Sequence, residues 1–405
     1  MRDTPVDNGE TGRGSSLREV TWLFLRLGVI AFGGPAAHIA MMHDEVVRRR
    51  GWLTEQRFLD LVGATNLIPG PSSTELAIHL GHERARWRGL VSAGVCFILP
   101  AALMVGALAA LYVGYGRTPE VTGILYGIRP VVVAIIAWAL FSLVRTALKT
   151  TYLWILAGGV LTAYLLGVNE LLLLAAGGLL TVAVRTASLR RSRPRGPGRE
   201  PPGEAGDGSR TSRALLAAPL ALAGGQDPDQ LLRLFLTMLK IGAVLYGSGY
   251  VLLAFLEGDF VERLGWLTPA QLADAVSIGQ FTPGPVFTTA TFVGYLVAGA
   301  PGAVLATVAI FLPSFLLVGL LTRITDRIRS RAWSSALLDG VNAAALALMA
   351  GVMLQLGRIS LVDPLTWALT AGTLLALWRT KLNSAWLIAA GAGVGLVSVI
   401  ATRLA

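Results

Sequence analysis

A Pro-Gly-Pro break interrupts an apolar stretch of this chain at Pro69–Pro71. Proline lacks the N–H that an interior helical turn uses and clashes with the turn before it, so the helix must break there. At membrane depth, broken backbone is tolerated only where protein or a water-filled cavity satisfies the freed polar groups. The same break occurs again at Pro283–Pro285. We therefore expect the chain to fold around two broken helices.

Composition indicates the environment of these helices. The chain has 405 residues, of which 54% are hydrophobic and only 14% are charged, and this balance excludes an ordinary soluble protein. Several apolar runs reach the roughly 20 residues that span a bilayer. The net charge of +10 comes from arginines in short loops between these runs, which indicates membrane orientation rather than nucleic-acid binding. The lipid bilayer is the expected partner.

The pattern around the first break recurs later in the chain. At a shift of 214 positions the matching pairs include Gly28 and Gly242, Trp52 and Trp266, Asp60 and Asp274, and Pro69 and Pro283. With one residue dropped, Gly89, Pro100 and Gly127 match Gly302, Pro313 and Gly340. A constant shift over this length predicts two homologous halves, and internal repeats of this kind are typical of secondary transporters.

The repeat defines the expected organisation of the chain. Residues 1–19 form a retained N-terminal tail, and residues 20–184 form the first repeat. Residues 185–229 are rich in arginine, proline, glycine and acidic residues that cannot bury a core, so this segment is expected to be a flexible basic linker. Residues 230–405 form the second repeat.

Loop charges favour one topology. If each Pro-Gly-Pro segment is re-entrant, the loops with Arg48–Arg57, Arg84–Arg88 and Arg323–Arg331 all face the cytoplasm, as the positive-inside rule expects. Full crossings at both breaks would place Arg48–Arg57 outside. We therefore expect an all-α polytopic membrane protein of two inverted-topology repeats. Each repeat has about five spanning helices and a re-entrant hairpin, although residues 20–42 can also be broken at Gly33–Pro35.

The breaks predict an anion site. The first N–H groups of a half-helix have no intrahelical partners and carry the positive end of the helix dipole. Hydroxyl and amide side chains at both breaks add uncharged donors, which suit an ion that must bind and then leave. The alternative is that these side chains only cap a kink. The candidate residues at the two breaks are Asn66, Pro69, Gly70, Pro71, Ser72, Ser73, Thr74, Gln280, Pro283, Gly284, Pro285, Thr288 and Thr289.

Three cations in apolar surroundings extend the candidate site, since ionisable residues inside a membrane are functional hypotheses by default. Arg26 and Lys240 occupy equivalent places in the first helix of each half, where they either hold a doubly charged oxyanion or extend to the interface. Arg129 precedes Pro130, and its counterpart is Asn342, so only one half carries that cation. A substrate-binding or gating role is expected for it.

Two titratable residues and a second break complete the candidates. Glu75 lies one turn into the half-helix, where it either exchanges protons or only favours the helix N-terminus. His38 either titrates near neutral pH or is a hydrogen-bonded structural residue. Gly33, Gly34 and Pro35 form a glycine break just before it and are included among the anion-binding residues.

Enzyme motifs are missing from the sequence. It has no His-Glu-x-x-His, Gly-x-Ser-x-Gly or P-loop motif, and its one cysteine, Cys96, cannot form a metal-binding pair. We therefore expect no catalytic residues, no metal and no cofactor. Energy must come from ion gradients or the membrane potential.

Several motifs together resemble the chromate ion transporter family. They are Phe32-Gly-Gly-Pro-Ala-Ala-His38, Gly51-Trp-Leu-Thr54 and Asn66-Leu-Ile-Pro-Gly-Pro71 in the first half, with Gly265-Trp-Leu-Thr268 and Gln280-Phe-Thr-Pro-Gly-Pro285 in the second. The resemblance covers about residues 20–184 and 230–400. It implies export of chromate across a bacterial cytoplasmic (inner) membrane, chromate resistance, and sulfate as the competing analogue, with the linker in the cytoplasm.

Some alternatives stay open at this point. Sulfate or another tetrahedral oxyanion has the same charge and shape as chromate, and an anion channel would use similar donors. The second half has Gly247-Ser-Gly249 where the first has Gly33-Gly-Pro35, so the first half can dominate binding. A homodimer is also left open.

Overall fold

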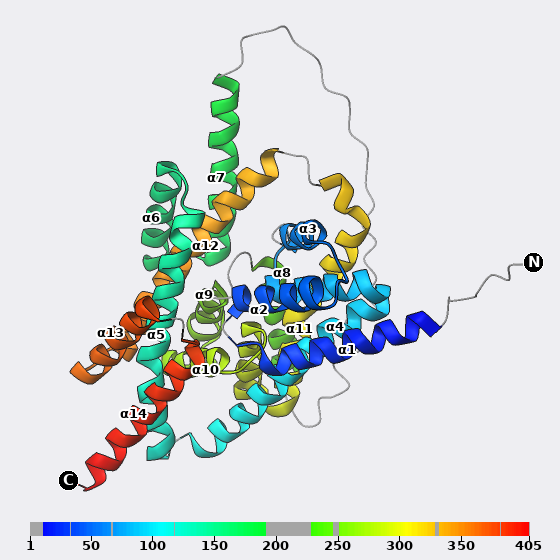
Figure 1. Cartoon of the computed structure of the whole chain (residues 1–405). Helices are drawn as coiled ribbons and strands as arrows, with labels where there is room; N and C mark the ends of the chain where they lie inside the picture. The colour runs from blue at the N-terminus through cyan, green and yellow to red at the C-terminus, as the bar shows by residue number, and fades with distance from the viewer. Residues whose placement is uncertain are drawn as a thin grey trace, which may run out of the picture.

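The structure is a computed structural model that describes residues 11–32, 34–65, 68–116, 118–191, 228–245, 251–328, 332–380 and 382–404. Every regular element within these ranges is helical (Figure 1). In the same ranges, six helices are long and apolar enough to cross a membrane, namely α4, α5, α7, α11, α12 and α14. The expected all-α polytopic membrane fold is confirmed, while the expected five crossings per repeat stay a prediction.

The two halves carry the same series of elements. The first has α1 (Thr11–Ile30), α2 (Gly34–His43), the π-helical segment η1 (Asp44–Arg49), α3 (Glu55–Thr65), α4 (Ser72–Tyr115), α5 (Pro119–Ala147), α6 (Thr151–Leu165) and α7 (Glu170–Arg191). The second has α8 (Pro228–Val244), α9 (Leu252–Leu256), the π-helical segment η5 (Glu257–Arg263), α10 (Pro269–Phe281), the 3-10 turn η6 (Val286–Thr288), α11 (Thr289–Ile328), α12 (Ala332–Ser360), α13 (Pro364–Arg379) and α14 (Ser384–Leu404). Helix α1 begins before the expected boundary at residue 20, and α7 continues past residue 184.

Helix α4 doubles back on itself. At Ala85 and Arg86 the backbone leaves the helical conformation, with φ of +54° at Arg86, and Gly81 then lies against the backbone of Gly89. Helix α11 has the equivalent turn at Ala298 and Gly299, where φ is +62°. Each Pro-Gly-Pro break thus joins a short helix, α3 or α10, to a half-helix that ends at this turn, and the short helix and half-helix together are called a hairpin below.

The first hairpin enters and leaves at one end. Arg57, near the start of α3, donates from Nη2 to Oε1 of Glu83, at the end of the half-helix, over 2.6 Å. The guanidinium of the next residue, Arg84, lies 5.2 Å from the ring centre of Trp52 in the loop before α3. This arrangement brings both ends of the hairpin together, which is the geometry that a re-entrant hairpin requires.

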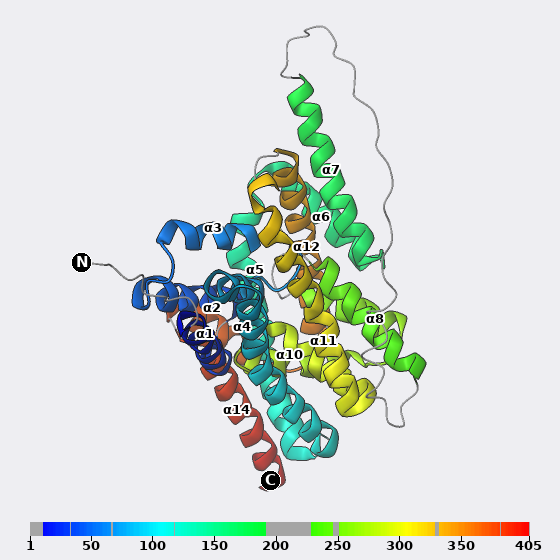
Figure 2. The same cartoon turned by 90° about the vertical axis from the view of Figure 1, so that its right-hand side faces the viewer.

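The helices form two groups, each built from both repeats. In the hairpin module, α1 packs along α4, α8 packs along α11, and α4 packs against α11 (Figure 2). In the bundle module, α5 lies along α14 and α13, while α12 lies along α7 and α6 (Figure 1). The bundle contacts are exchanged between repeats, so neither repeat forms this module alone.

Glycines permit the exchanged contacts of the bundle module. Gly127 of α5 lies against the carbonyl of Gly391 in α14, and Gly340 of α12 lies against the carbonyl of Gly177 in α7. A Cβ at either Gly127 or Gly340 would overlap that carbonyl oxygen. The two glycines occupy equivalent places in the repeats, so the same small-residue helix contact is formed twice.

Replacing Gly127 by leucine should therefore destabilise the protein. The larger side chain must force α5 away from α14, at a cost of about 1–3 kcal/mol or more. Thermal unfolding of the purified protein in detergent measures the effect. Gly158→Leu in α6 is the matched control, because nothing lies within 4 Å of a Cβ built there. Equal unfolding temperatures for the two variants would contradict the proposed role of the contact.

Candidate functional site

The first break docks onto the second repeat. Gly70 has φ of +135°, a conformation that favours glycine, and its N–H donates to the carbonyl of Leu245 over 2.7 Å. Leu245 directly follows α8, the first helix of the second repeat. The half-helix then begins at Ser72, and its first backbone bonds run from Thr74 and Glu75 to the carbonyl of Pro71.

The second break makes the reciprocal contact. Gly284 has φ of +92°, and its N–H donates over 2.8 Å to the carbonyl of Ala31, which directly follows α1. A Cβ at Gly284 would lie 2.7 Å from the Cβ of Ala101 and 3.3 Å from the carbonyl oxygen of Gly28. Gly70 and Gly284 are equivalent, as are Ala31 and Leu245, so the breaks exchange matching hydrogen bonds between the repeats.

The hydroxyl groups at the two breaks differ in their hydrogen bonding. At the second break, Thr288 donates to the carbonyl of Pro285 over 2.7 Å, and Thr289 donates to that of Val286 over 2.8 Å. These two hydroxyls cap the kink, as the structural alternative expects. At the first break, Oγ1 of Thr74 is buried with no hydrogen-bond partner among the described residues.

The remaining residues at the breaks are placed as follows. Ser73 is buried and its hydroxyl lies 3.3 Å from Nδ1 of His38, while Ser72 is half-buried. Within the described ranges, Nε2 of Gln280 is buried and unpartnered.

The prolines of the two breaks are largely buried: Pro71, Pro283 and Pro285 are buried and Pro69 is half-buried. Gly34 opens α2 with φ of +77°, followed by Pro35. Asn66 and Gly33 lie outside the described residues.

His38 ties the glycine break to the first half-helix. Its Nε2 donates to the carbonyl of Ala31 over 3.0 Å, so this carbonyl accepts from both His38 and Gly284. With Nε2 protonated, Nδ1 is left to accept from the hydroxyl of Ser73. The ring also makes an edge contact with Phe97, at 5.6 Å between centroids. Both ring nitrogens of His38 thus take part in structural hydrogen bonds in this conformation.

Arg26 and Lys240 each pair with an acid of their own repeat. Lys240 donates to Asp259 over 2.7 Å, and Arg26 lies 3.7 Å from Glu45. Asp259 and Glu45 occupy equivalent positions, and each also pairs with an arginine four residues later, Arg263 or Arg49. The sequence analysis considered the cations without these acids. Each acid follows its cation by 19 residues in both repeats, and this regular spacing could have identified the pairs.

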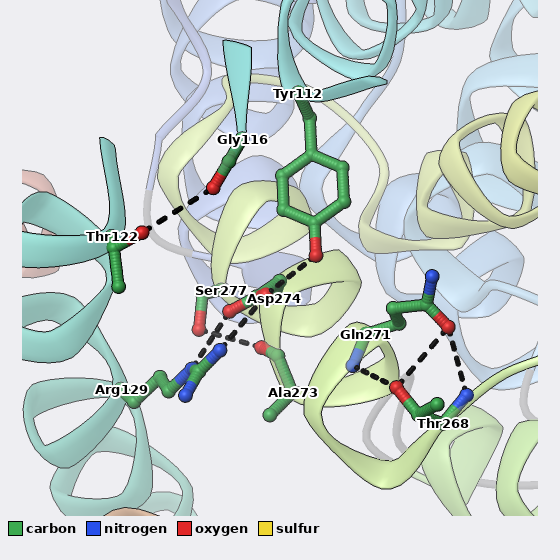
Figure 3. A network of polar contacts seen from close by, with 9 residues as sticks. All are labelled: Tyr112, Gly116, Thr122, Arg129, Thr268, Gln271, Ala273, Asp274 and Ser277. Atoms are coloured by element: carbon green, nitrogen blue, oxygen red, sulfur yellow. Dashed lines mark hydrogen bonds and ion pairs between the residues drawn. The ribbon is translucent and has the colours of Figure 1, made fainter. Parts of the chain in front are cut away.

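Arg129 also has a carboxylate partner, which lies in the other repeat. Its Nε donates to Oδ1 of Asp274 over 2.7 Å and its Nη2 donates to Oδ2 over 2.9 Å (Figure 3). The hydroxyl of Tyr112 donates to Oδ2 as well, over 2.9 Å. Asp274 is 2% exposed and Arg129 is 25% exposed at the side chain. The pair joins α5 of the bundle module to α10, the helix before the second break.

The sequence analysis used Asp274 only as a repeat match to Asp60. Asp60 lies on α3 and accepts a hydrogen bond from Gln56, 3.4 Å away. Helix α10 packs against α11, as α3 packs against α4, and it also packs against α5, α12 and α14. Among the described residues, the second hairpin therefore contacts the bundle module more extensively, and Arg129 contributes to that contact.

Taken together, these features define a polytopic all-α membrane protein of two repeats, whose broken helices meet at a common centre. A family model described as Chromate transporter matches the chain twice, at residues 18–182 and 232–396. The chain belongs to the chromate transporter family.

Curated relatives match nearly the whole length. A chromate transport protein of Cupriavidus metallidurans is 34% identical over 391 residues, which is 95% of this chain and 93% of that protein. A probable chromate transport protein of Synechococcus elongatus is 31% identical, covering 94% of this chain and 95% of that protein. A chromate transport protein of Pseudomonas aeruginosa is 31% identical over 89% of this chain and 87% of its own length. No solved structure matches.

Breaking the largely buried pair of Arg129 and Asp274 should destabilise the protein strongly. Removing one partner of a buried ion pair typically costs about 3–5 kcal/mol, since the other charge is left without compensation. A double-mutant cycle with Arg129→Gln and Asp274→Asn, read by thermal unfolding in detergent, should show strong coupling.

The more exposed pair of Arg185 and Asp339, which also joins the two repeats at 3.5 Å, is the matched control. Its cycle should give less than about 1 kcal/mol. Similar small coupling in both cycles would contradict a structural role for the Arg129–Asp274 pair.

Proposed function

We propose that this protein exports chromate from the cytoplasm and that the anion binds between the two Pro-Gly-Pro breaks. The proposal rests first on the reciprocal hydrogen bonds of Gly70 and Gly284 with Leu245 and Ala31. These bonds hold the two breaks at one interface between the repeats. Each break begins a helical segment whose first N–H groups favour an anion. Family membership and the names of the relatives support chromate as the substrate.

The membrane potential supplies enough energy for export. Moving one charge through 100 mV gains about 2.3 kcal/mol, so expelling a dianion from a negative interior gains about 4.6 kcal/mol. This energy can sustain a ratio of more than a thousandfold between the chromate concentrations on the two sides of the membrane. Export of this kind would give the cell chromate resistance.

We propose the inverted topology for the two repeats, with the basic loops and the linker on the cytoplasmic side of a bacterial inner membrane. The pair of Arg57 and Glu83 supports a re-entrant first hairpin. The carboxyl of Glu170 lies against Gly258, so the corner before α7 and the segment η5 are neighbours. The topology places both of these on the outer side.

Transport by alternating access fits the unequal docking of the hairpins. Inverted-repeat transporters move by rocking one group of helices against another. Here α10 is joined to α5 through Asp274 and Arg129, whereas the position equivalent to Arg129 in the second repeat is Asn342. We propose that the Arg129–Asp274 pair acts as a gate that opens when the second hairpin undocks.

Transport of radiolabelled chromate into inverted membrane vesicles tests the substrate and the direction. Saturable uptake driven by an inside-positive potential is expected, with sulfate as a competitor. Gly70→Ala should abolish uptake, because a φ of +135° is strained for any residue except glycine and the added Cβ would also overlap Oε1 of Glu75 and the hydroxyl of Ser314. Gly51→Ala is the control, since Gly51 also has positive φ, at +58°, but nothing lies within 4 Å of its Cβ.

Two results would reject this function. Vesicles without saturable chromate uptake would remove the substrate assignment, and strong uptake of sulfate alone would replace it. Conductance in planar bilayers without saturation would indicate a channel.

Single cysteines at Arg49 and Arg86 test the topology, after Cys96 has been replaced by alanine. Both should react with a membrane-impermeant thiol reagent from the cytoplasmic side, since the re-entrant hairpin returns to the side from which it enters. Labelling from opposite sides would show that the Pro-Gly-Pro segment crosses the membrane.

A further inference from the structure

Glu75 is the most completely buried carboxyl group in the first half-helix. Its exposure is 0%, and among the described residues only the hydroxyl of Ser314 is close enough to interact with the carboxyl group, without a well-aligned hydrogen bond. It lies beside the bare Cα of Gly70, together with the hydroxyl of Ser314 from α11. A carboxyl group and a hydroxyl group from opposite repeats thus meet at the first break.

Other unpartnered atoms lie on the same half-helix and on the facing helix α11. Within the described ranges, Oγ1 of Thr74, Nε2 of His79 and Oγ of Ser314 are also buried without hydrogen-bond partners, and none of these residues exceeds 2% exposure. Buried polar groups in folded proteins are nearly always paired. Their concentration at one helix N-terminus indicates a built site for something other than protein.

The second break lacks this chemistry. The position equivalent to Glu75 is Thr289, whose hydroxyl donates to the carbonyl of Val286 over 2.8 Å. The position equivalent to Ser314 is Ala101, whose methyl group lies beside Gly284. Because the same backbone is built there without a carboxyl group, Glu75 is not required by the fold of the break.

No charged side chain described in the structure pairs with Glu75. His79 follows on the same helix, and His38 of α2 has both ring nitrogens in use. Helix α11 contributes Ser314 and has no charged residue from 289 to 322.

The charged groups of the other nearby helices have partners of their own. Arg57 of α3 pairs with Glu83. In the same way, Arg26 of α1 pairs with Glu45, Lys240 of α8 pairs with Asp259, and Asp274 of α10 pairs with Arg129. An ionised carboxylate buried without a counter-ion costs several kcal/mol, whereas a protonated one avoids that cost.

We infer that Glu75 is a proton-binding site and that the anion occupies the neighbouring half-helix end only while Glu75 carries its proton. This inference rests on the proposed anion site. An ionised Glu75 would repel a dianion at close range in a medium of low dielectric constant. Protonation removes that repulsion and leaves a hydroxyl donor. The second break, which has no carboxyl group, stays independent of pH.

Infrared spectroscopy of the purified protein tests the proton directly and needs no substrate. The wild type should show a carboxylic acid C=O band that disappears in Glu75→Gln. The absence of any band that depends on Glu75, at all pH values at which the protein stays folded, would overturn the inference even if chromate transport is established.

Equilibrium exchange of chromate across proteoliposomes tests the coupling, at pH values where chromate is fully a dianion. Wild-type exchange should fall as the pH rises, by up to about tenfold per pH unit, the slope of one titrating group. Glu75→Gln should exchange at every pH, with a flat profile. His43→Gln and His82→Gln are the controls and should keep the wild-type slope, because His43 bonds Glu55 and His82 contacts Trp87, both away from the proposed site.

The outcomes separate this inference from the transport function. A sloped profile in Glu75→Gln, or a flat profile in the wild type, would overturn the coupling while leaving chromate transport intact. Exchange that follows sodium concentration at fixed pH would assign the site to a metal cation instead. Thermal unfolding of Glu75→Gln at or above the wild-type temperature would show that the variant is folded.

Discussion

The architecture depends on two backbone hydrogen bonds that cross between the repeats. Proline removes the helical bonds at each break, and the freed N–H of the central glycine has no water at membrane depth to replace them. In each case the N–H donates to the carbonyl that directly follows the first helix of the opposite repeat. Gly70 donates to Leu245, and Gly284 donates to Ala31. Neither break is satisfied within its own repeat, so the two halves must fold against each other before either hairpin is complete.

The sequence was sufficient to predict the breaks, the repeats and the membrane class, because proline chemistry and hydrophobic length are local properties. It did not reveal the partners of the intramembrane charges. Arg129 meets Asp274 across 145 positions, and no local pattern connects them. The exchange of α5 with α14 and of α12 with α7 was also missed, since glycine contacts such as Gly127 with Gly391 depend on the tertiary packing.

Duplication explains both the regularity and the exceptions. Features that the backbone requires are kept in both halves, such as the turn at Arg86 and its counterpart at Gly299. The charged pair of Arg26 and Glu45 is matched by Lys240 and Asp259, but two other charged residues differ between the halves, with Arg129 opposite Asn342 and Glu75 opposite Thr289. A scaffold built from two repeats with matching backbones does not need matching side chains. We therefore expect the residues that differ between the halves to carry the functions specific to each half.

This asymmetry has a direct electrostatic consequence. Two equivalent half-helix ends, one from each repeat, would attract a dianion equally. In the proposed mechanism, such a site would bind the anion too tightly to release it in either conformation of the transporter. A carboxyl group at only one end makes the attraction conditional, because its charge opposes the dipole that favours the anion. The cation at Arg129 is likewise conditional, because Asp274 compensates it while the second hairpin is docked. In the proposed mechanism, binding and release then depend on which groups are neutral in each state, and this would let uncharged donors serve a doubly charged ion.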